Sequence, residues 1–78
     1  MTTDRIALAL GGSITEARTR ANINKSTLAR LVGVVPSAVT RWENGERRPS
    51  LDNLVAMSIV LETSFVELTA CIDWEGVA

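Results

Sequence analysis

The middle of the chain carries apolar residues at the spacing of a short helix. Leu28, Leu31 and Val32 recur at positions i, i+3 and i+4, which places them on one stripe of a helix. Asn24 precedes the stripe and can cap the first turn with its side chain. Gly33 follows the stripe, and glycine commonly ends a helix in the left-handed conformation. The pattern therefore predicts a helix over residues 25–32.

A second helix is predicted three residues later, over Pro36–Asn44. Proline suits the first position of a helix because the N–H group that it lacks would have no partner there. Val39 and Trp42 lie three residues apart and turn one face toward the core. Ala29 in the preceding helix is small enough for the two helices to cross closely. Two short helices joined by such a turn form a helix-turn-helix motif, which indicates double-stranded DNA as the ligand.

A longer helix is predicted before this motif, over about Arg5–Ala21. Gly11 and Gly12 interrupt its pattern, and glycine costs roughly 1 kcal/mol relative to alanine inside a helix. We therefore expect the first two turns to form a separate or frayed piece. The apolar face that turns inward consists of Ile6, Ala9, Leu10, Ile14 and Ala17.

Two helices are predicted after the motif. Ser50 can cap a helix over about Leu51–Leu61, and Ser64 with Glu67 forms a capping box for a last helix over about Phe65–Ile72. The sequence contains no segment with the alternating pattern of a strand. The predicted fold class is therefore all-α, with five helices.

Charge divides sharply along the chain. All eight Lys and Arg residues lie in residues 1–48 with four acids, whereas residues 49–78 hold five acids and no base. The two parts therefore carry +4 and −5, although the total charge is only −1. This division predicts a basic face over the helix-turn-helix, as phosphate binding requires, and an acidic back that repels DNA.

Length and composition narrow the classes of function. Seventy-eight residues, 46% of them hydrophobic, suit one domain, with a core over residues 10–70 and a short tail over 71–78. No apolar run is long enough for a membrane span, and the N-terminus lacks a secretory signal. The one cysteine, Cys71, cannot form an internal disulfide, which fits the cytoplasm. The absence of histidine and of metal-ligand spacing argues against an enzyme, a metal and a cofactor.

The helix-turn-helix pattern resembles the Cro/C1-type repressors, the XRE family, over roughly residues 10–68. The resemblance implies a five-helix, lambda-repressor-like domain that acts as a small Cro-like repressor of phage type. It is carried by the segments Ile23–Ala29, Gly33-Val34 and Val39–Gly45, and by Pro49–Leu51, Leu54, Met57-Ser58, Leu61 and Ser64–Leu68.

The outer face of the second motif helix supplies the expected base contacts, which are Pro36, Ser37, Thr40 and Arg41. In the resembled repressors, the positions of Pro36, Ser37 and Arg41 often read bases. Arg41 is the strongest candidate, because a guanidinium can bond O6 and N7 of guanine together, worth about 1–3 kcal/mol in discrimination. The alternative for Arg41 is an ordinary solvated surface charge.

A different set of residues is expected to bind phosphates. Arg18 and Glu43 belong neither to this set nor to the set expected to contact bases. In the resembled family, the positions matching Arg18 and Glu43 pair with each other, so we expect a partly buried structural ion pair. Asn44 has a second reading, because Asn-Gly is a turn signal by itself. The expected phosphate contacts are Lys25, Thr27, Asn44, Arg47 and Arg48.

The chain departs from the resembled family in two places. Val35 replaces the usual Ser or Thr that caps the recognition helix, at a cost of roughly 1 kcal/mol. The tail is apolar and acidic, and Val66, Ile72 and Trp74 give more apolar surface than so small a monomer buries easily. We therefore expect a homodimer that contacts a palindromic operator through two half-sites. The alternative is that Trp74 folds back onto its own core.

The sequence therefore predicts a sequence-specific DNA-binding transcriptional regulator, and most simply a repressor. Its expected partners are operator DNA and a second copy of the chain, with no small-molecule ligand. Two alternatives remain open. One is the antitoxin of a toxin–antitoxin pair, and the other is a protein-interaction module that has lost DNA binding.

Overall fold

Five helices make up most of residues 4–72, the part of the chain that the computed structural model describes. They are α1 (Arg5–Arg20), α2 (Lys25–Val32), α3 (Pro36–Glu43), α4 (Leu51–Val60) and α5 (Phe65–Thr69). No strand occurs within these residues, and the predicted all-α architecture of five helices is confirmed.

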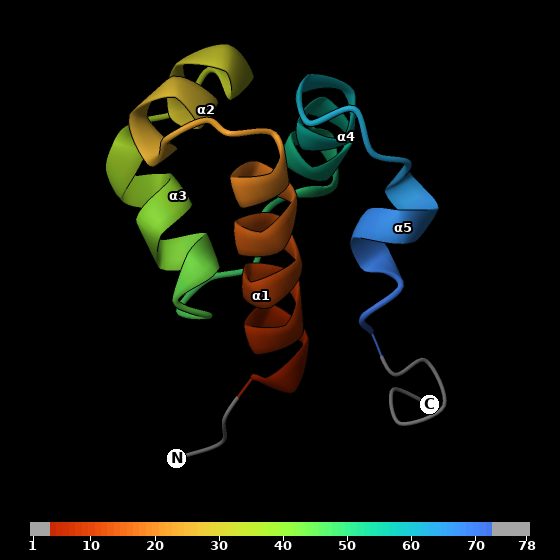
Figure 1. Cartoon of the computed structure of the whole chain (residues 1–78). Helices are drawn as coiled ribbons and strands as arrows, with labels where there is room; N and C mark the ends of the chain where they lie inside the picture. The colour runs from red at the N-terminus through yellow and green to blue at the C-terminus, as the bar shows by residue number, and fades with distance from the viewer. Residues whose placement is uncertain (1–3, 73–78) are drawn as a thin grey trace.

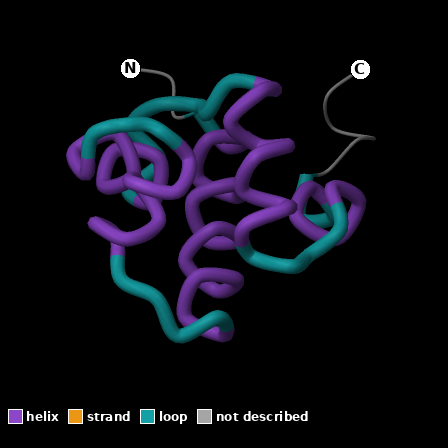
Figure 2. Tube along the Cα trace, turned by 90° about the horizontal axis from the view of Figure 1, so that it is seen from above, coloured by secondary structure: helices purple, strands orange, loops and turns teal. Residues whose placement is uncertain are grey.

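Helix α1 stands at the centre of the arrangement (Figure 1). Helices α2 and α3 lie on one side of it, and α4 and α5 lie on the other. Helix α1 contacts both α3 and α5, while α2 contacts both α3 and α4. Short loops join successive helices (Figure 2). The α2–α3 pair is therefore supported from two directions, by α1 behind α3 and by α4 beside α2.

The core lies where these helices meet. Ile14, Leu28, Val39 and Met57 come from four different helices and are fully shielded from solvent. Each such side chain contributes about 1.5–3 kcal/mol through burial. Trp42 is only 5% exposed. It therefore lies in the core, as predicted, and is not placed to stack on a DNA base. The other members of the central cluster are Leu10, Ala17, Ala29, Leu54, Leu61 and Leu68.

Side-chain caps fix the start of every helix except α3. The oxygen of each N-cap accepts a backbone N–H of the first turn, an interaction worth about 1 kcal/mol. The predicted capping box on α5 forms only in part, because the carboxylate of Glu67 accepts from the hydroxyl of Thr63 at 3.1 Å instead of reaching back to the cap. The four capping residues are Asp4, Asn24, Ser50 and Ser64.

Two details of the predicted helices were wrong. Helix α5 ends at Thr69 rather than Ile72, because the N–H groups of Ala70 and Ile72 bond to carbonyls three residues back and form turns instead of helix. Leu31 is 49% exposed, so the inner stripe of α2 is narrower than the spacing predicts. The other helix ends differ from the prediction by no more than one residue.

The expected break in α1 at Gly11 and Gly12 is also wrong, since the helix is continuous from Arg5 to Arg20. The structure gives Gly11 a packing role. A Cβ atom added there would lie 2.5 Å from the carbonyl oxygen of Trp42 and 2.7 Å from that of Glu43. Gly11 thus allows α1 to cross the end of α3 at backbone distance. At Gly12 an added Cβ would meet nothing within 4 Å.

The two glycines should respond oppositely to alanine. Gly11→Ala should lower the free energy of unfolding by about 2 kcal/mol, because the new methyl group would push against backbone that cannot move aside easily. Gly12→Ala should raise it by up to about 1 kcal/mol, since alanine is the better helix former in open space. Urea denaturation of the two variants and the parent chain measures both changes. Equal effects at both positions would contradict the assigned close approach.

Candidate nucleic-acid interface

The turn between α2 and α3 has the geometry that its sequence predicts. Gly33 is left-handed, with φ of +89°, a conformation that side chains rarely adopt. The N–H groups of Gly33 and Val34 both bond to the carbonyl of Ala29, at 2.8 and 2.9 Å. Ala29 itself is fully buried under the crossing helix. This tight turn directs α3 across α2 and leaves the start of α3 at the surface.

Helix α3 begins without a side-chain cap. Val35 occupies the cap position in an extended conformation, makes no capping bond and is 63% exposed. Pro36 is the first helical residue and supplies the preset backbone angle in place of the cap. The surface at this end of α3 is therefore apolar.

The expected base contacts lie together along the outer face of α3. Pro36, Ser37 and Arg41 are exposed and Thr40 is half-buried, whereas Val39 and Trp42 face the core. Among residues 4–72, no ion pair or side-chain hydrogen bond engages Arg41. Its guanidinium is thus available to an external acceptor. This face presents the guanidinium of Arg41, the hydroxyls of Ser37 and Thr40, and the ring of Pro36.

The expected phosphate contacts fall at the beginning of α2 and after α3. Lys25 and Thr27 are half-buried in the first turn of α2, and Thr27 donates its backbone N–H to the Asn24 side chain at 2.7 Å. Asn44 caps the C-terminal end of α3 and is exposed. Arg47 is exposed and, within the described part of the chain, makes no ion pair.

Arg48 differs from Arg47, because an ion pair ties it to the start of α1. Its Nε and one Nη donate to the two carboxylate oxygens of Asp4, at 2.7 and 3.0 Å. This bond, together with the N–H of Ala7, holds the pKa of Asp4 below its usual value. The same bond to Asp4 raises the pKa of Arg48. This pair is not among those predicted from the sequence. The place of Asp4 before a helical pattern signals the cap, but it does not reveal the distant arginine.

Arg18 and Glu43 form the expected partly buried ion pair, which joins α1 to the last residue of α3. Arg18 Nε donates to Glu43 Oε2 at 2.7 Å and Nη2 donates to Oε1 at 3.1 Å. The remaining Nη1 donates to the carbonyl of Ile23 at 3.0 Å. Thr15, which the sequence analysis did not single out, donates its hydroxyl to Glu43 at 2.9 Å. The hydrogen bond to Glu43 raises the pKa of Arg18.

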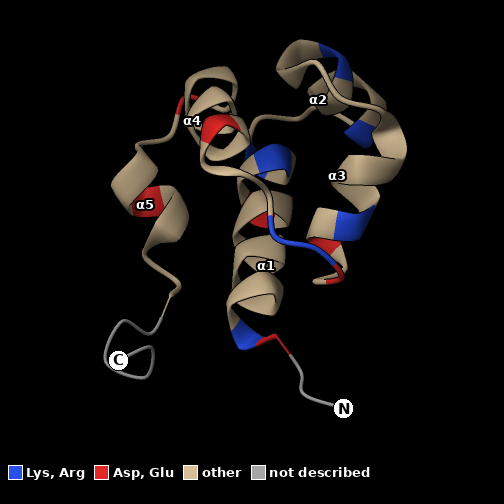
Figure 3. Cartoon of the chain, turned by 180° about the vertical axis from the view of Figure 1, so that it is seen from behind, with Lys and Arg blue, Asp and Glu red and all other residues tan. Residues whose placement is uncertain are grey.

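The charges take the distribution that the sequence predicts. Lys and Arg appear on α1, α2 and α3 and along the loop after α3 (Figure 3). Acids lie on α4 and α5, and some also lie on α1, at the end of α3 and in the loop after it. An anionic ligand should therefore approach the side that presents α2 and α3. Because the basic groups are few, this attraction should be weak, and salt should screen it further.

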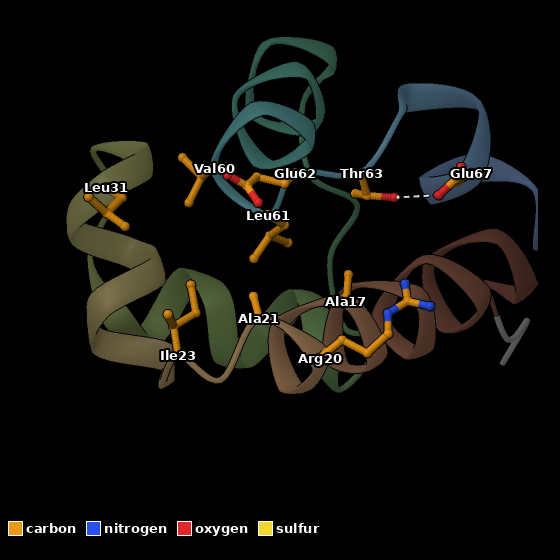
Figure 4. Close-up of a pocket in the computed structure, with 10 residues that line it drawn as sticks. All are labelled: Ala17, Arg20, Ala21, Ile23, Leu31, Val60, Leu61, Glu62, Thr63 and Glu67. Carbon is orange, nitrogen blue, oxygen red and sulfur yellow. Dashed lines mark hydrogen bonds between the residues drawn. The ribbon is translucent and has the colours of Figure 1, made fainter.

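A shallow groove of about 500 Å³ lies away from this face, between the end of α1, α2 and α4 (Figure 4). Ile23, Leu31 and Val60 form apolar parts of its wall, and Arg20, Glu62 and Glu67 are charged members. None of its lining residues belongs to α3. Over residues 4–72, no three metal-ligating side chains gather anywhere, and no helix is long and apolar enough to cross a membrane.

The residues expected at a dimer contact have different environments. Val66 is 75% exposed on α5. Ile72 is partly buried against the chain's own core and offers less surface than expected. Trp74 lies outside the described residues. The largest exposed apolar side chains on α4 are Leu51, Val55 and Ile59, which recur every fourth residue along one face.

Comparison with known proteins agrees with this geometry. Residues 14–68 match the family model described as Helix-turn-helix. Repressor protein C2 of Salmonella phage P22 is 34% identical over 55 residues, which make up 70% of this chain and 26% of that protein. The chain thus spans about a quarter of the length of this curated relative.

Three solved structures share the fold. The P22 c2 repressor, crystallised with a synthetic operator, gives a TM-score of 0.74 at 32% identity, covering 81% of this chain and 96% of that one. The restriction-modification controller protein C.AhdI of Aeromonas hydrophila gives 0.75 at 32% identity, covering 80% and 94%. Hydroxypropylphosphonic acid epoxidase of S. wedmorenis gives 0.76 at 30% identity, but only 36% of that enzyme is covered, against 87% of this chain.

Neutralising Glu43 should destabilise the fold more than neutralising a nearby exposed acid. The side chain of Glu43 is 4% exposed, so Glu43→Gln leaves Arg18 with an uncompensated charge in a poorly solvated place. We expect a loss of about 3 kcal/mol in the free energy of unfolding. Glu46→Gln is the matched control, because Glu46 is exposed and should change stability by less than about 0.5 kcal/mol. Similar denaturation midpoints for the two variants would rule out this role for the pair.

Proposed function

Because the chain belongs to the helix-turn-helix family of Cro/C1-type DNA-binding transcription regulators, we propose that it represses transcription by binding a palindromic operator as a homodimer. Its five-helix fold is that of the repressor domains it resembles. The observation that carries the proposal is the outer face of α3. There Arg41, which has no side-chain partner among residues 4–72, and two hydroxyls are presented on a helix anchored to the core.

In the proposed complex α3 lies in the major groove. Arg41 bonds a guanine, Ser37 and Thr40 bond base edges with less selectivity, and Pro36 with Val35 contacts a thymine methyl. Apolar residues at the start of α3 make this end sensitive to thymine rather than to a phosphate oxygen. The P22 c2 repressor, which is similar in sequence and fold, was crystallised on an operator, and this supports the same use of α3 here.

Backbone contacts fix the position of α3 on the duplex. Lys25 and Thr27 at the start of α2 contact the phosphates on one side of the groove. The phosphates on the other side are contacted from the end of α3 and the loop after it, by Asn44, Arg47 and Arg48. The charge distribution supports this assignment, because every Lys and Arg in residues 4–72 lies before α4. So few cations give weak binding by one copy, which favours two copies on two half-sites.

The proposed dimer forms through α4 and α5. Ile59 is 71% exposed, Leu51 is 65% exposed and Val66 is 75% exposed. A helix that is apolar on both its inner and outer faces needs a second partner besides its own core. The exposed α4 face and Val66 make the surface that a second copy would cover. Ile72 and Trp74, which the sequence also predicts at a dimer contact, belong to the same proposed surface near the end of the chain.

The same surface supports one other function. An apolar face edged by Asp52 and Glu62 suits a basic protein partner, as an antitoxin would require. Arg41 is exposed on α3 without an ion-pair partner in residues 4–72, and this favours DNA binding as the primary activity over a pure protein-interaction module.

Removing Arg41 should abolish preference at one base position. Duplexes selected by the parent chain from a random pool should form a palindrome, and Arg41→Ala should lose about 1–3 kcal/mol of discrimination at one position per half-site. Arg30→Ala removes an exposed arginine from the other end of α2 and should keep the parent's preference. Failure of the parent to enrich any sequence at low salt would overturn the proposed function.

The dimer is tested by placing a charge in the apolar surface. Ile59→Asp and Val66→Asp should each shift sedimentation toward the monomer and weaken binding to a full palindrome more than to a half-site. Thr19→Asp, on the exposed face of α1, is the control for adding an acid. A parent chain that sediments as a monomer and binds both DNA lengths equally would refute the dimer.

A further inference from the structure

The two adjacent arginines after α3 have unequal freedom. Arg47 has no ion-pair partner among the described residues, whereas Arg48 uses two donors, on the Nε–Nη2 edge of its guanidinium, to bind Asp4. A carboxylate and a phosphate can each accept two parallel hydrogen bonds from this planar group. The Nε and Nη2 donors that hold Asp4 therefore cannot hold a phosphate in the same way at the same time.

Asp4 is itself fixed in place. It is the N-cap of α1, and its Oδ1 accepts the backbone N–H of Ala7 at 3.1 Å while it also accepts from Arg48. Anions are favoured at this end of a helix by the helix dipole. If Arg48 leaves, the carboxylate keeps the cap bond and the dipole, so it is not left unsatisfied. Arg48 can thus move between two anions at low cost to the fold.

The pair is open to solvent on both sides. The Arg48 side chain is 55% exposed and that of Asp4 is 39% exposed. Water and salt screen such a pair, which keeps it weak enough to exchange. In this respect it is the opposite of the Arg18–Glu43 pair, where the exposed fractions are 16% and 4%.

We propose that Asp4 competes with the DNA backbone for Arg48 and so lowers the affinity of the protein for DNA. The inference rests on the proposed function, since it concerns one cation of the proposed phosphate set. Its effect is on the nonspecific, electrostatic part of binding, because a phosphate contact carries no base information. Asp4 would therefore limit occupancy of arbitrary DNA without changing which operator is preferred.

Asp4→Asn separates the two roles of Asp4. Asparagine is as good an N-cap as aspartate, so the bond to Ala7 can remain while the negative charge that holds Arg48 is lost. Asp52→Asn is the matched control. Asp52 is an exposed aspartate near the start of another helix, in the first turn of α4, and among the described residues it has no arginine partner.

The affinity for a short labelled duplex of arbitrary sequence is measured at several salt concentrations for the parent, D4N, R48A, D4N/R48A and D52N. D4N should bind about two- to five-fold more tightly at low salt, the range expected for release of one exposed ion pair. Its salt dependence should steepen by up to about 0.9 in slope, for one more phosphate contact. The gain should vanish in D4N/R48A, and D52N should not reproduce it.

The outcomes separate this inference from the proposed function. If the parent binds the duplex and D4N binds equally or more weakly, Asp4 does not compete for Arg48, although the DNA-binding function stands. An equal gain from D52N, or a gain that survives in D4N/R48A, shows general charge repulsion and also overturns the competition. If the parent binds no duplex at low salt, the proposed function itself fails. Circular dichroism of D4N should match the parent, because the cap is retained.

Discussion

The position of helix α3 depends on how closely α1 crosses its C-terminal end. Two contacts act at this crossing. Gly11 lets the backbone of α1 approach the carbonyls of Trp42 and Glu43, and the Arg18 guanidinium binds both carboxylate oxygens of Glu43. Gly11 sets how closely α1 and α3 approach, and the Arg18–Glu43 ion pair fixes how α3 is oriented against α1. Neither residue touches the exposed face of α3, yet together they orient that face.

Helix α3 needs this support because its own sequence stabilises it poorly. It has eight residues, fewer than an isolated helix needs in water, and its first turn has no side-chain cap. Val39 and Trp42 anchor its inner face in the core. The Arg18–Glu43 pair anchors its end, and the turn at Gly33 sets its beginning. The outer face of α3 is thereby left free of structural roles, so that Ser37 and Arg41 are available for the contacts that the proposed function assigns to them.

Local signals in the sequence predicted most of the fold, and they failed where distant residues decide the outcome. Caps at Asn24, Ser50 and Ser64, and the turn at Gly33, follow from short-range chemistry and were predicted. The continuity of α1 through Gly11 was not, because propensity records the cost of glycine but not the neighbour that requires it. The Asp4–Arg48 pair joins residues 44 positions apart, and a single sequence offers no periodicity that links them. The Arg18–Glu43 pair was anticipated only through the family resemblance.

The low net charge of the chain is consistent with these placements. Two of the arginines are held by carboxylates, Arg18 by Glu43 and Arg48 by Asp4. Neither is therefore fully available to a phosphate in the free protein. Lys25, Arg41 and Arg47 are the cations best placed to act on DNA from α2, α3 and the following loop. A chain that meets DNA with so few free cations gains little from nonspecific attraction. Under the proposed function, selectivity comes from base contacts by Arg41 and its neighbours and from the binding of two half-sites together. The apolar face of α4 therefore matters as much to that proposal as the polar face of α3.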